Sequence, residues 1–126
     1  MADTTGMNLL NKRNDLPGAP NAREFIGAHH DGVPVSLILV EHEPGAGPRL
    51  HRHSYPELFV VDVGQAEFEI DGEHAVATAG DILVAPGGTA HRFTNTGTGR
   101  LRLTAIHTAE HFDTEWIDPG TNGSSC

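Results

Sequence analysis

The apolar residues of this chain gather in short segments that are separated by turns rich in glycine and proline. Residues 35–40 form a nearly continuous apolar run, a pattern typical of a strand that is covered on both faces. In residues 67–70 charged and bulky side chains alternate, which indicates a strand with one wet and one dry face. No helical periodicity extends over more than a turn or two. The pattern therefore predicts an all-β fold, either a sandwich or a barrel.

The predicted strands lie between recognisable turn signals. Asp-Gly pairs at 31–32 and 71–72 favour tight hairpin turns, because such pairs tolerate positive φ values. We expect Val76 to be packed and residues 82–84 to form a buried strand, and we favour a last strand at 112–116 over a single helical turn. The predicted strands cover residues 23–28, 33–43, 58–63, 65–70, 73–79, 82–84, 89–96, 101–107 and 112–116.

The length of 126 residues predicts a single domain, large enough to bury most of its apolar surface without disulfides or metals as staples. Residues 1–22 are polar and lack periodicity, so we interpret them as a mostly irregular N-terminal arm with a short strand near 7–10. The β domain then occupies residues 23–117. Residues 118–126 are predicted to form a disordered C-terminal tail.

The acidic net charge of the chain argues against some classes of binding partner. The sequence has 17 acidic and 8 basic side chains and a formal net charge of −9, which argues against nucleic acid or an anionic membrane as partner. No apolar run approaches the ~20 residues that a membrane-spanning helix needs. Residues 1–6 lack the features of a signal peptide, and the single cysteine, Cys126, leaves no internal disulfide. A cytoplasmic protein is the simplest interpretation.

The residues with the clearest chemical meaning are His51, His53 and Glu57. Residues two apart on a strand point to the same face and lie ~6.6 Å apart along the backbone, so both imidazoles can converge on one metal ion. Pro56 interrupts the strand ladder, and a corner there can bring Glu57 back toward the same ion. For the His-x-His pair alone, two chance histidines on a surface strand remain the alternative.

Two blocks of the sequence resemble the two motifs of the cupin family. The first motif combines a glycine, His-x-His, a glutamate and a glycine at fixed spacing, and the chain matches it at Gly45, His51, His53, Glu57 and Gly64. The second combines a glycine, Pro-x-Gly, a histidine and an asparagine, and the chain matches it at Gly80, Pro86, Gly88, His91 and Asn95. The resemblance implies that residues 23–117 fold as a double-stranded β-helix, or jelly-roll barrel, with the site in its mouth.

The resemblance further implies a metal site in which His51, His53, Glu57 and His91 surround one ion. Three neutral imidazoles and a carboxylate suit one divalent transition metal per chain, that is Mn, Fe, Ni, Co, Cu or Zn. Four protein ligands leave two open positions on an octahedral ion, enough for a bidentate substrate or for one substrate atom and water or O₂. Such a metal could polarise a carbonyl, stabilise an enolate or activate oxygen.

Strand parity indicates which apolar side chains surround the ion. Phe59 and Val61 share parity with Glu57, and Phe93 shares parity with His91. We expect Phe59, Val61 and Phe93 to line a substrate pocket, with plain core packing as the alternative.

Four polar residues are further candidates for roles near the site. Arg49 could grip the carboxylate of an anionic substrate, or pair with an acid at the rim. His107 is a candidate acid–base catalyst if alternate residues of its strand face inward, and otherwise lies in solvent at the strand end. Tyr55 could donate a hydrogen bond at the mouth or lie on the surface. Asn95 is expected to tie down a turn. The remaining histidines join no cluster: His29, His30, His42, His74 and His111.

Two classes of function remain open. The first is a small metal-dependent enzyme acting on a polar small molecule, either a dioxygenase or an isomerase or lyase that works through an enolate. The second is a binding module that senses or stores a ligand without converting it. We favour the enzyme, because the resemblance implies open metal positions and the sequence offers an acid–base group. The resemblance also leads us to expect a homodimer, since exposed sheet edges invite a partner.

Overall fold

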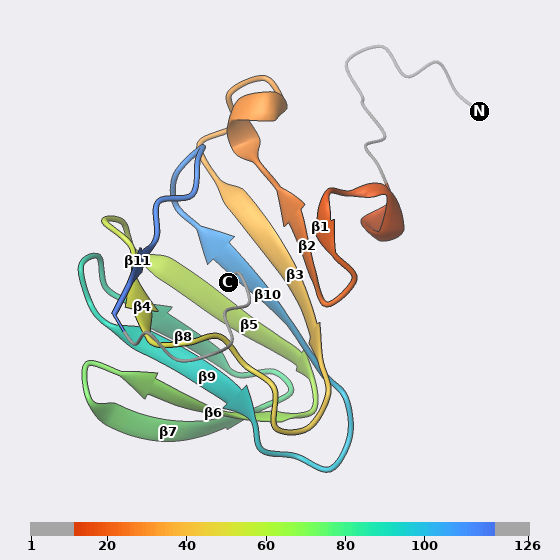
Figure 1. Ribbon diagram of the computed structural model, residues 1–126, viewed down its shortest axis with the longest axis vertical. Coiled ribbons are helices and arrows are strands. Elements are labelled where there is room, and N and C mark those ends of the chain that lie inside the picture. The colour runs from red at the N-terminus through yellow and green to blue at the C-terminus, as the bar shows by residue number, and fades with distance from the viewer. Residues whose placement is uncertain (1–11, 118–126) are drawn as a thin grey trace.

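The computed structural model describes residues 12–117, which fold into two antiparallel sheets that face each other (Figure 1). One sheet has six strands, in the order β1 (Gly18–Ala19), β2 (Ala22–Phe25), β3 (Ser36–His42), β10 (Leu101–His107), β5 (Glu57–Val63) and β8 (Ile82–Ala85). The other has five, in the order β11 (Glu115–Trp116), β4 (His51–Arg52), β9 (His91–Asn95), β6 (Gln65–Ile70) and β7 (Glu73–Thr78). The only helical turns within residues 12–117 are η1 (Arg13–Asp15) and η2 (Gly27–His29). The predicted all-β jelly-roll architecture is confirmed.

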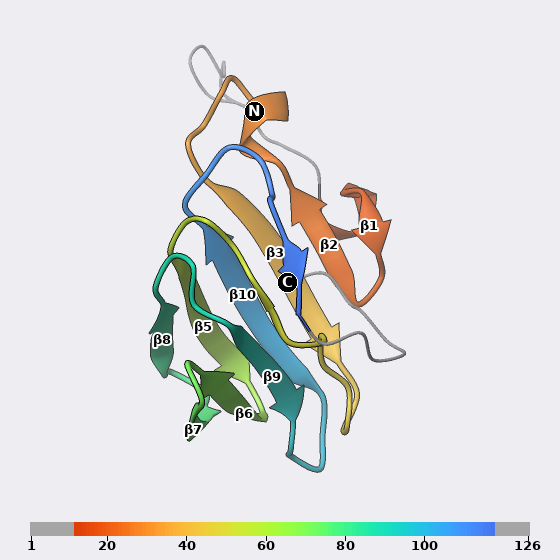
Figure 2. The ribbon, with the colours of Figure 1, turned by 60° about the vertical axis from the view of Figure 1, so that its left-hand side comes forward.

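The roll is open rather than a closed barrel. Within the described residues, no strand of one sheet pairs with a strand of the other. The chain crosses from one sheet to the other at the turn between β7 and β8, where the Gly80 N–H donates to the Val61 carbonyl at 2.8 Å and the Val61 N–H donates to the Asp81 carbonyl at 3.0 Å. The chain therefore joins β5 of the opposite sheet directly, and β7 and β8 remain as separate sheet edges (Figure 2).

Alternating burial along the central strands builds the core between the sheets. In β3, β9 and β10 every second side chain is buried, as expected for strands with one face toward the core. Leu37 and Leu39 of β3 are half-buried, so the apolar run there has one fully buried face instead of the predicted two. The buried apolar cluster consists of Ala22, Ile38, Val40, Phe59, Val61, Ala66, Phe68, Ala77, Ala85, Phe93, Leu101, Leu103 and Ala105.

Two burial predictions for the edge strands are wrong. Val76 of β7 is 60% exposed, and Ile82 and Val84 of β8 are 63% and 53% exposed. Alternation along each strand turns these side chains away from the core, while Ala77 of β7 and Ala85 of β8 have the opposite parity and are buried. Apolar character alone did not distinguish an edge strand from a central one.

The strand positions follow the sequence prediction closely, with changes at the ends. The hairpin between β6 and β7 turns at Asp71 and Gly72, whose φ values are 54° and 78°, as the Asp-Gly pair predicts. The predicted strand at 112–116 shortens to β11, the strand expected to carry His51 and His53 is limited to β4, and β1 was not predicted. The short strand predicted near residues 7–10 and the tail at 118–126 lie outside the described residues. The domain limits stay a prediction.

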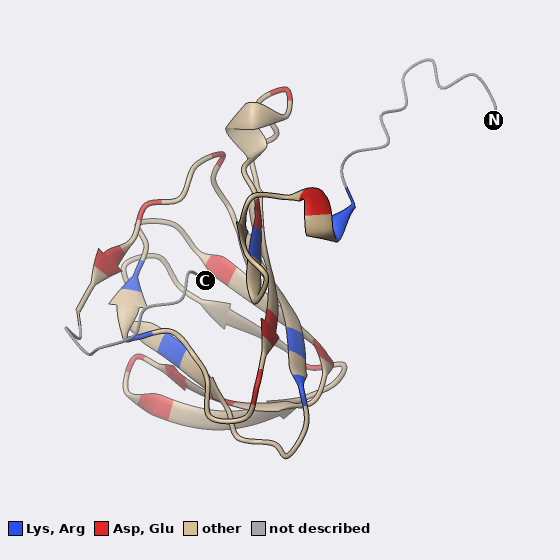
Figure 3. Ribbon diagram, turned by 45° about the vertical axis from the view of Figure 1, so that its right-hand side comes forward, with Lys and Arg blue, Asp and Glu red and all other residues tan. Residues whose placement is uncertain are grey.

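Surface charges are distributed over both sheets and their turns (Figure 3). Glu41 on β3 has three arginine neighbours: Arg13, Arg100 and Arg102 lie 3.7, 3.0 and 3.1 Å from its carboxylate oxygens. Exposed pairs of this kind contribute ~1 kcal/mol or less to stability. No helix within residues 12–117 has the length and apolar character required to cross a membrane.

His42 at the end of β3 is an unusual core residue. It is 1% exposed and stacks on Phe93 with ring centroids 5.8 Å apart, and neither of its ring nitrogens has a hydrogen-bond partner among the described residues. Burial lowers the pKa of His42 below its ordinary value. A buried polar group without a partner costs about 1–3 kcal/mol.

Replacing His42 by leucine is expected to raise the free energy of unfolding by about 1 kcal/mol at pH 7. The gain should increase at acid pH, because a histidine with a lowered folded-state pKa loses stability as pH falls through its unfolded pKa of about 6.5. Urea unfolding of metal-free wild type and variant at pH 7 and pH 5 measures both effects. An equal difference at the two pH values would contradict the assignment.

Candidate metal centre

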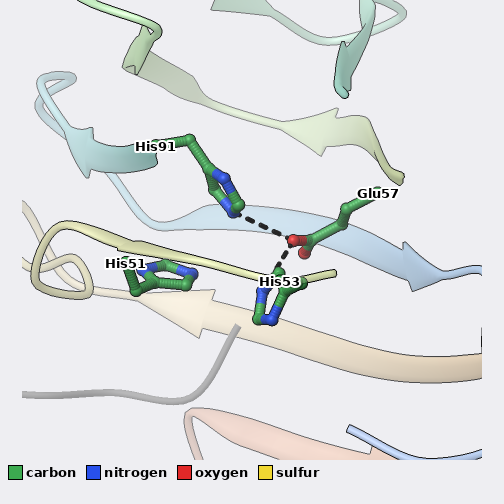
Figure 4. Close-up of side chains that lie close together, drawn as sticks. All are labelled: His51, His53, Glu57 and His91. Carbon is green, nitrogen blue, oxygen red and sulfur yellow. Dashed lines mark hydrogen bonds and ion pairs between the residues drawn. The ribbon is translucent and has the colours of Figure 1, made fainter. Parts of the chain in front are cut away.

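Four buried side chains from both sheets meet in the space between them (Figure 4). The potential ligand atoms of His51, His53, Glu57 and His91 all lie within 4.8 Å of one another, and each of these residues is at most 3% exposed. Oε1 of Glu57 lies 3.1 Å from Nε2 of His53 and 3.0 Å from Nε2 of His91. Neighbouring ligand atoms bound to one ion at 2.0–2.2 Å are separated by roughly 3 Å. The spacing therefore fits a shared metal ion.

Residues His51 and Glu57 are close in sequence but approach the cluster from opposite sheets, because the chain changes sheets between them. His51 lies on β4 and pairs with His91 of β9 in the same sheet. The His53 carbonyl just beyond β4 accepts the Gly88 N–H at 2.7 Å, which fixes the chain beside the loop before β9. After Pro56 the chain enters β5 of the other sheet, and Glu57 is the first residue of that strand. The carboxylate therefore faces the three imidazoles across the gap.

A backbone carbonyl fixes the orientation of each of the three imidazoles. The Nδ1 atoms of His51, His53 and His91 lie 2.6, 2.5 and 3.0 Å from the carbonyl oxygens of Arg49, Asp113 and Thr89, respectively. A carbonyl can only accept, so Nδ1 of each neutral ring carries the proton and Nε2 carries the lone pair. Metal-binding histidines are commonly oriented in this way.

The protonation states also suit metal binding. Burial and the charge of His91 lower the pKa of His51 to about 4, although the hydrogen bond to the Arg49 carbonyl opposes the shift. Burial alone would raise the pKa of Glu57, but in the metal-free protein the imidazoles of His107, His53 and His91, 3.0–3.1 Å from its oxygens, stabilise the carboxylate and hold its pKa well below the usual range. At neutral pH the cluster therefore offers a neutral His51 and an ionised Glu57, and metal ligands must be deprotonated. Three imidazole nitrogens and one carboxylate oxygen match a divalent transition metal better than calcium or magnesium.

A small cavity borders the cluster at His53. It has a volume of about 280 Å³, and the residues that line it are Arg52, His53, Ser54, Gly88, Asp113, Thr114 and Glu115. One wall is the C-terminal strap, which we define as residues 108–117; it runs past the site to pair with β4 through β11 (Figure 1). Two side-chain contacts fasten it there: the Asp113 carboxylate accepts hydrogen bonds from the Ser54 N–H and hydroxyl, and Glu115 accepts two from Arg52 at 3.0 Å.

A second cavity, of about 460 Å³, opens between the edges of β7 and β8. Its walls include Phe68, Ile70 and Leu83, but none of the four clustered residues lines it. Of these two cavities, the one beside His53 is therefore the one that adjoins the candidate metal centre.

The aromatic and aliphatic residues predicted for a substrate pocket lie in the core. Phe59, Val61 and Phe93 are 0%, 1% and 0% exposed, and none of them lines the cavity beside His53. Phe59 does reach the cluster, with its ring centroid 5.6 Å from that of His91. This placement favours the packing alternative that parity had left open, and substrate contact by these residues stays a prediction.

The polar candidates occupy more informative positions. The guanidinium of Arg49 lies over the Trp116 ring, 4.7 Å from its centroid, and Trp116 in turn contacts the His51 ring at 5.0 Å. His107 is fully buried, with Nε2 3.1 Å from Oε2 of Glu57. Tyr55 lies between the cluster and the strap, with its hydroxyl 2.7 Å from Nδ1 of His107.

Asn95 adopts the structural position expected of it. Its amide nitrogen donates to the carbonyls of His42 and Gly99, and its side-chain oxygen accepts the Gly97 N–H at 2.9 Å. These bonds hold the turn between β9 and β10.

Sequence reasoning missed Asp113, Trp116 and the carbonyl of Thr89. Asp113 touches the cluster through its backbone carbonyl, a group that every residue carries. No residue type therefore marks such a contact in the sequence.

The sequence and the fold are similar to those of known proteins. A family model described as a cupin domain matches residues 38–107, which is more than half of the chain. Oxalate decarboxylase from Bacillus subtilis has a similar structure, with a TM-score of 0.69 and 22% identity over 79% of this chain and 28% of that chain. The formate complex of Lactobacillus farciminis oxalate decarboxylase gives 0.72 and 21%, over 82% of this chain and 34% of that one. An oxalate oxidase gives 0.72 and 21%, over 86% and 63%.

This chain thus spans less than two thirds of the length of each of these enzymes. At 21–22% identity, the likeness shows a shared fold. No curated protein matches the sequence.

Proposed function

The chain belongs to the cupin family, and on that premise we propose that it is a metal-dependent enzyme that converts a small polar molecule. The observation that carries the proposal is the convergence of three oriented imidazoles and one carboxylate beside an open cavity. In this proposal His51, His53, Glu57 and His91 hold one divalent transition metal per chain. When bound, such a metal would polarise a substrate carbonyl or carboxylate and stabilise negative charge that develops on it.

The residues around the cluster prepare this chemistry. The carbonyls of Arg49, Asp113 and Thr89 hold the imidazoles in their ligand orientation before any metal arrives, so little rearrangement is needed. The buried rings of Phe59 and Phe93 exclude water from the side of the cluster that faces the core, which strengthens the electrostatic interactions there.

The cavity supports a small, oxygen-rich substrate. A volume of about 280 Å³ lies at the low end of small-molecule sites. Arg52 in its lining is neutralised by Glu115, so positive charge for an anionic substrate would come from the metal, and Arg49 could supply more if it turned away from Trp116. Together with the oxalate enzymes among the structural neighbours, these features favour a small carboxylate, oxalate included. The reaction would be an oxidation or a lyase or isomerase step, since one metal centre can serve each of them.

Turnover by metal-loaded protein tests the proposal. Protein loaded with Mn²⁺, Fe²⁺, Co²⁺, Ni²⁺, Cu²⁺ or Zn²⁺ is offered a panel of small carboxylates, catechols, diketones and thiols, with oxygen consumption, CO₂ release and product formation recorded. We expect conversion of at least one compound, reduced more than about 100-fold by chelation, because a metal supplies several kcal/mol of charge stabilisation.

The His74→Ala variant, which alters an exposed histidine outside the cluster, should behave as wild type. Metal-loaded protein that binds a compound without converting it would point to the alternative, a binding or sensing module. Protein that binds none of the metals would overturn the proposal. A homodimer and a cytoplasmic location stay predictions from the sequence.

A further inference from the structure

The two oxygens of the Glu57 carboxylate have different surroundings. Oε1 faces the Nε2 atoms of His53 and His91 at 3.1 and 3.0 Å. Oε2 lies 3.1 Å from Nε2 of His107, within ion-pair distance, and neither of these two buried atoms has an aligned hydrogen-bond partner in the part of the chain that the structure describes. One oxygen thus belongs to the metal cluster, while the other is directed toward a histidine outside it.

The tautomer of His107 follows from this contact. A carboxylate oxygen only accepts, so the neutral imidazole that fits this contact carries its proton on Nε2, 3.1 Å from Oε2. Nδ1 then has a lone pair and needs a donor, and the Tyr55 hydroxyl at 2.7 Å is placed to provide it. The Tyr55 oxygen also accepts the backbone N–H of Asp113 at 3.4 Å. The bonds therefore run in one direction, from the strap through Tyr55 and His107 to Glu57.

His107 thus differs from the three clustered histidines in a way that the sequence does not reveal. His51, His53 and His91 direct Nδ1–H at carbonyls and present an Nε2 lone pair toward the metal position. In His107 the Nε2 atom carries a hydrogen instead of a lone pair. In this tautomer Nε2 of His107 is therefore a donor and cannot be a metal ligand. Its ring is held by an edge contact with Phe112, at a centroid distance of 4.7 Å.

Tyr55 is also fixed on its apolar side. Its ring stacks on that of His53 with centroids 5.1 Å apart and planes inclined by 5°. Asp113 contacts both members of this stack, since its carbonyl accepts from His53 and its N–H donates to Tyr55. One residue of the strap therefore helps to orient both His53 and the chain of bonds that ends at Glu57.

We propose that Tyr55 and His107 are positioning residues, which hold Oε2 of Glu57 through its 3.1 Å contact with Nε2 of His107, so that Oε1 is the oxygen that faces the metal position. This inference rests on the proposed metal site and is an alternative to the catalytic roles predicted for both residues from sequence. Its consequence for function is direct: a carboxylate that binds through one oxygen leaves a coordination position free for substrate. Asp113 anchors the arrangement to the strap.

The test uses Co²⁺ alone as the probe and compares wild type with Tyr55→Phe, His107→Leu and His107→Gln. We expect the Kd for Co²⁺ to rise about 10-fold in Tyr55→Phe and about 100-fold in His107→Leu, the range observed when partners behind a metal ligand are removed. Glutamine can still donate to Oε2, so His107→Gln should recover part of the loss.

Infrared difference spectra on Co²⁺ binding supply a readout that general loosening would not reproduce. The splitting between the two carboxylate stretching bands is wide when one oxygen binds a metal and narrow when both do. We expect the Glu57 splitting to narrow in Tyr55→Phe and His107→Leu. The matched control is Phe112→Leu, which removes the ring packed on His107 but no hydrogen bond, and should leave the splitting unchanged.

The outcomes separate this inference from the proposed function. If wild type binds no Co²⁺ or other transition metal, both are overturned. If wild type binds Co²⁺ and Tyr55→Phe binds it with the same Kd and the same band splitting, this inference alone is overturned. Tyr55→Phe removes one hydroxyl and no carbon, so the test stands even if His107→Leu fails to fold.

Discussion

A His91→Ala protein is expected to lose its metal, while the wild type should carry close to one transition-metal ion per chain. The substitution removes one of four ligands and leaves Oε1 of Glu57 facing His53 alone. Because removal of a partner behind a ligand already costs 10–100-fold in affinity, loss of a ligand should weaken binding by more than about 100-fold. Elemental analysis of protein equilibrated with micromolar Mn²⁺ or Zn²⁺ measures the effect.

The controls for this experiment come from the same chain. His74→Ala removes an exposed histidine that pairs with Glu67 at 3.2 Å outside the cluster, and should leave the stoichiometry unchanged. Circular dichroism should show that His91→Ala keeps its β structure, so that metal loss reflects the missing ligand. A His91→Ala protein that retains a full equivalent of metal would mean that the ion binds elsewhere.

The sequence predicted which four side chains would cluster, because their positions are marked by residue type. Histidine and glutamate at fixed offsets are rare by chance, and the glycines and prolines between them report the turns that fold the two motifs together. The fold class followed for the same reason, since strand length and punctuation are local properties. The structure brings all four predicted ligands into one cluster.

The sequence did not predict which side chains on different strands would contact each other. Parity assigns a residue to a face of its strand but does not show how deep it lies or which strand it faces. His107 is directed at Oε2 of Glu57 because β10 pairs with β5 in the register that sets His107 opposite Glu57. The strap contacts through Asp113 join residues far apart in the chain by backbone atoms, so no side-chain pattern announces them.

Because parity does not show how deep a side chain lies, it left two interpretations of the aromatic residues near the cluster. Phe93 shares a strand face with His91, which fits both a wall of a substrate pocket and a core position. In the structure its ring lies 5.9 Å from that of Phe59 and 5.4 Å from that of Phe68, with no exposed surface. The two interpretations predict different consequences for the same substitution.

Replacing Phe93 by alanine is expected to lower the free energy of unfolding by about 3–5 kcal/mol, because a fully buried ring is exchanged for a cavity. A loss of that size is a large part of the 5–15 kcal/mol that stabilises most domains, so the variant should be prepared at low temperature and unfolded with urea. The folded fraction should still bind one metal ion per chain, since Phe93 contributes no ligand.

Phe93→Leu is the matched variant, because it keeps most of the apolar volume, and should cost ~1.5 kcal/mol or less. A graded loss of stability from leucine to alanine, with metal stoichiometry preserved in both, would assign Phe93 to the core. The opposite result would be a Phe93→Ala protein with the same urea midpoint of unfolding as wild type and a higher KM for a substrate. The ring of Phe93 then faces a pocket that substrate enters. In that case the cavity beside His53 would extend past His91 into the space between the sheets.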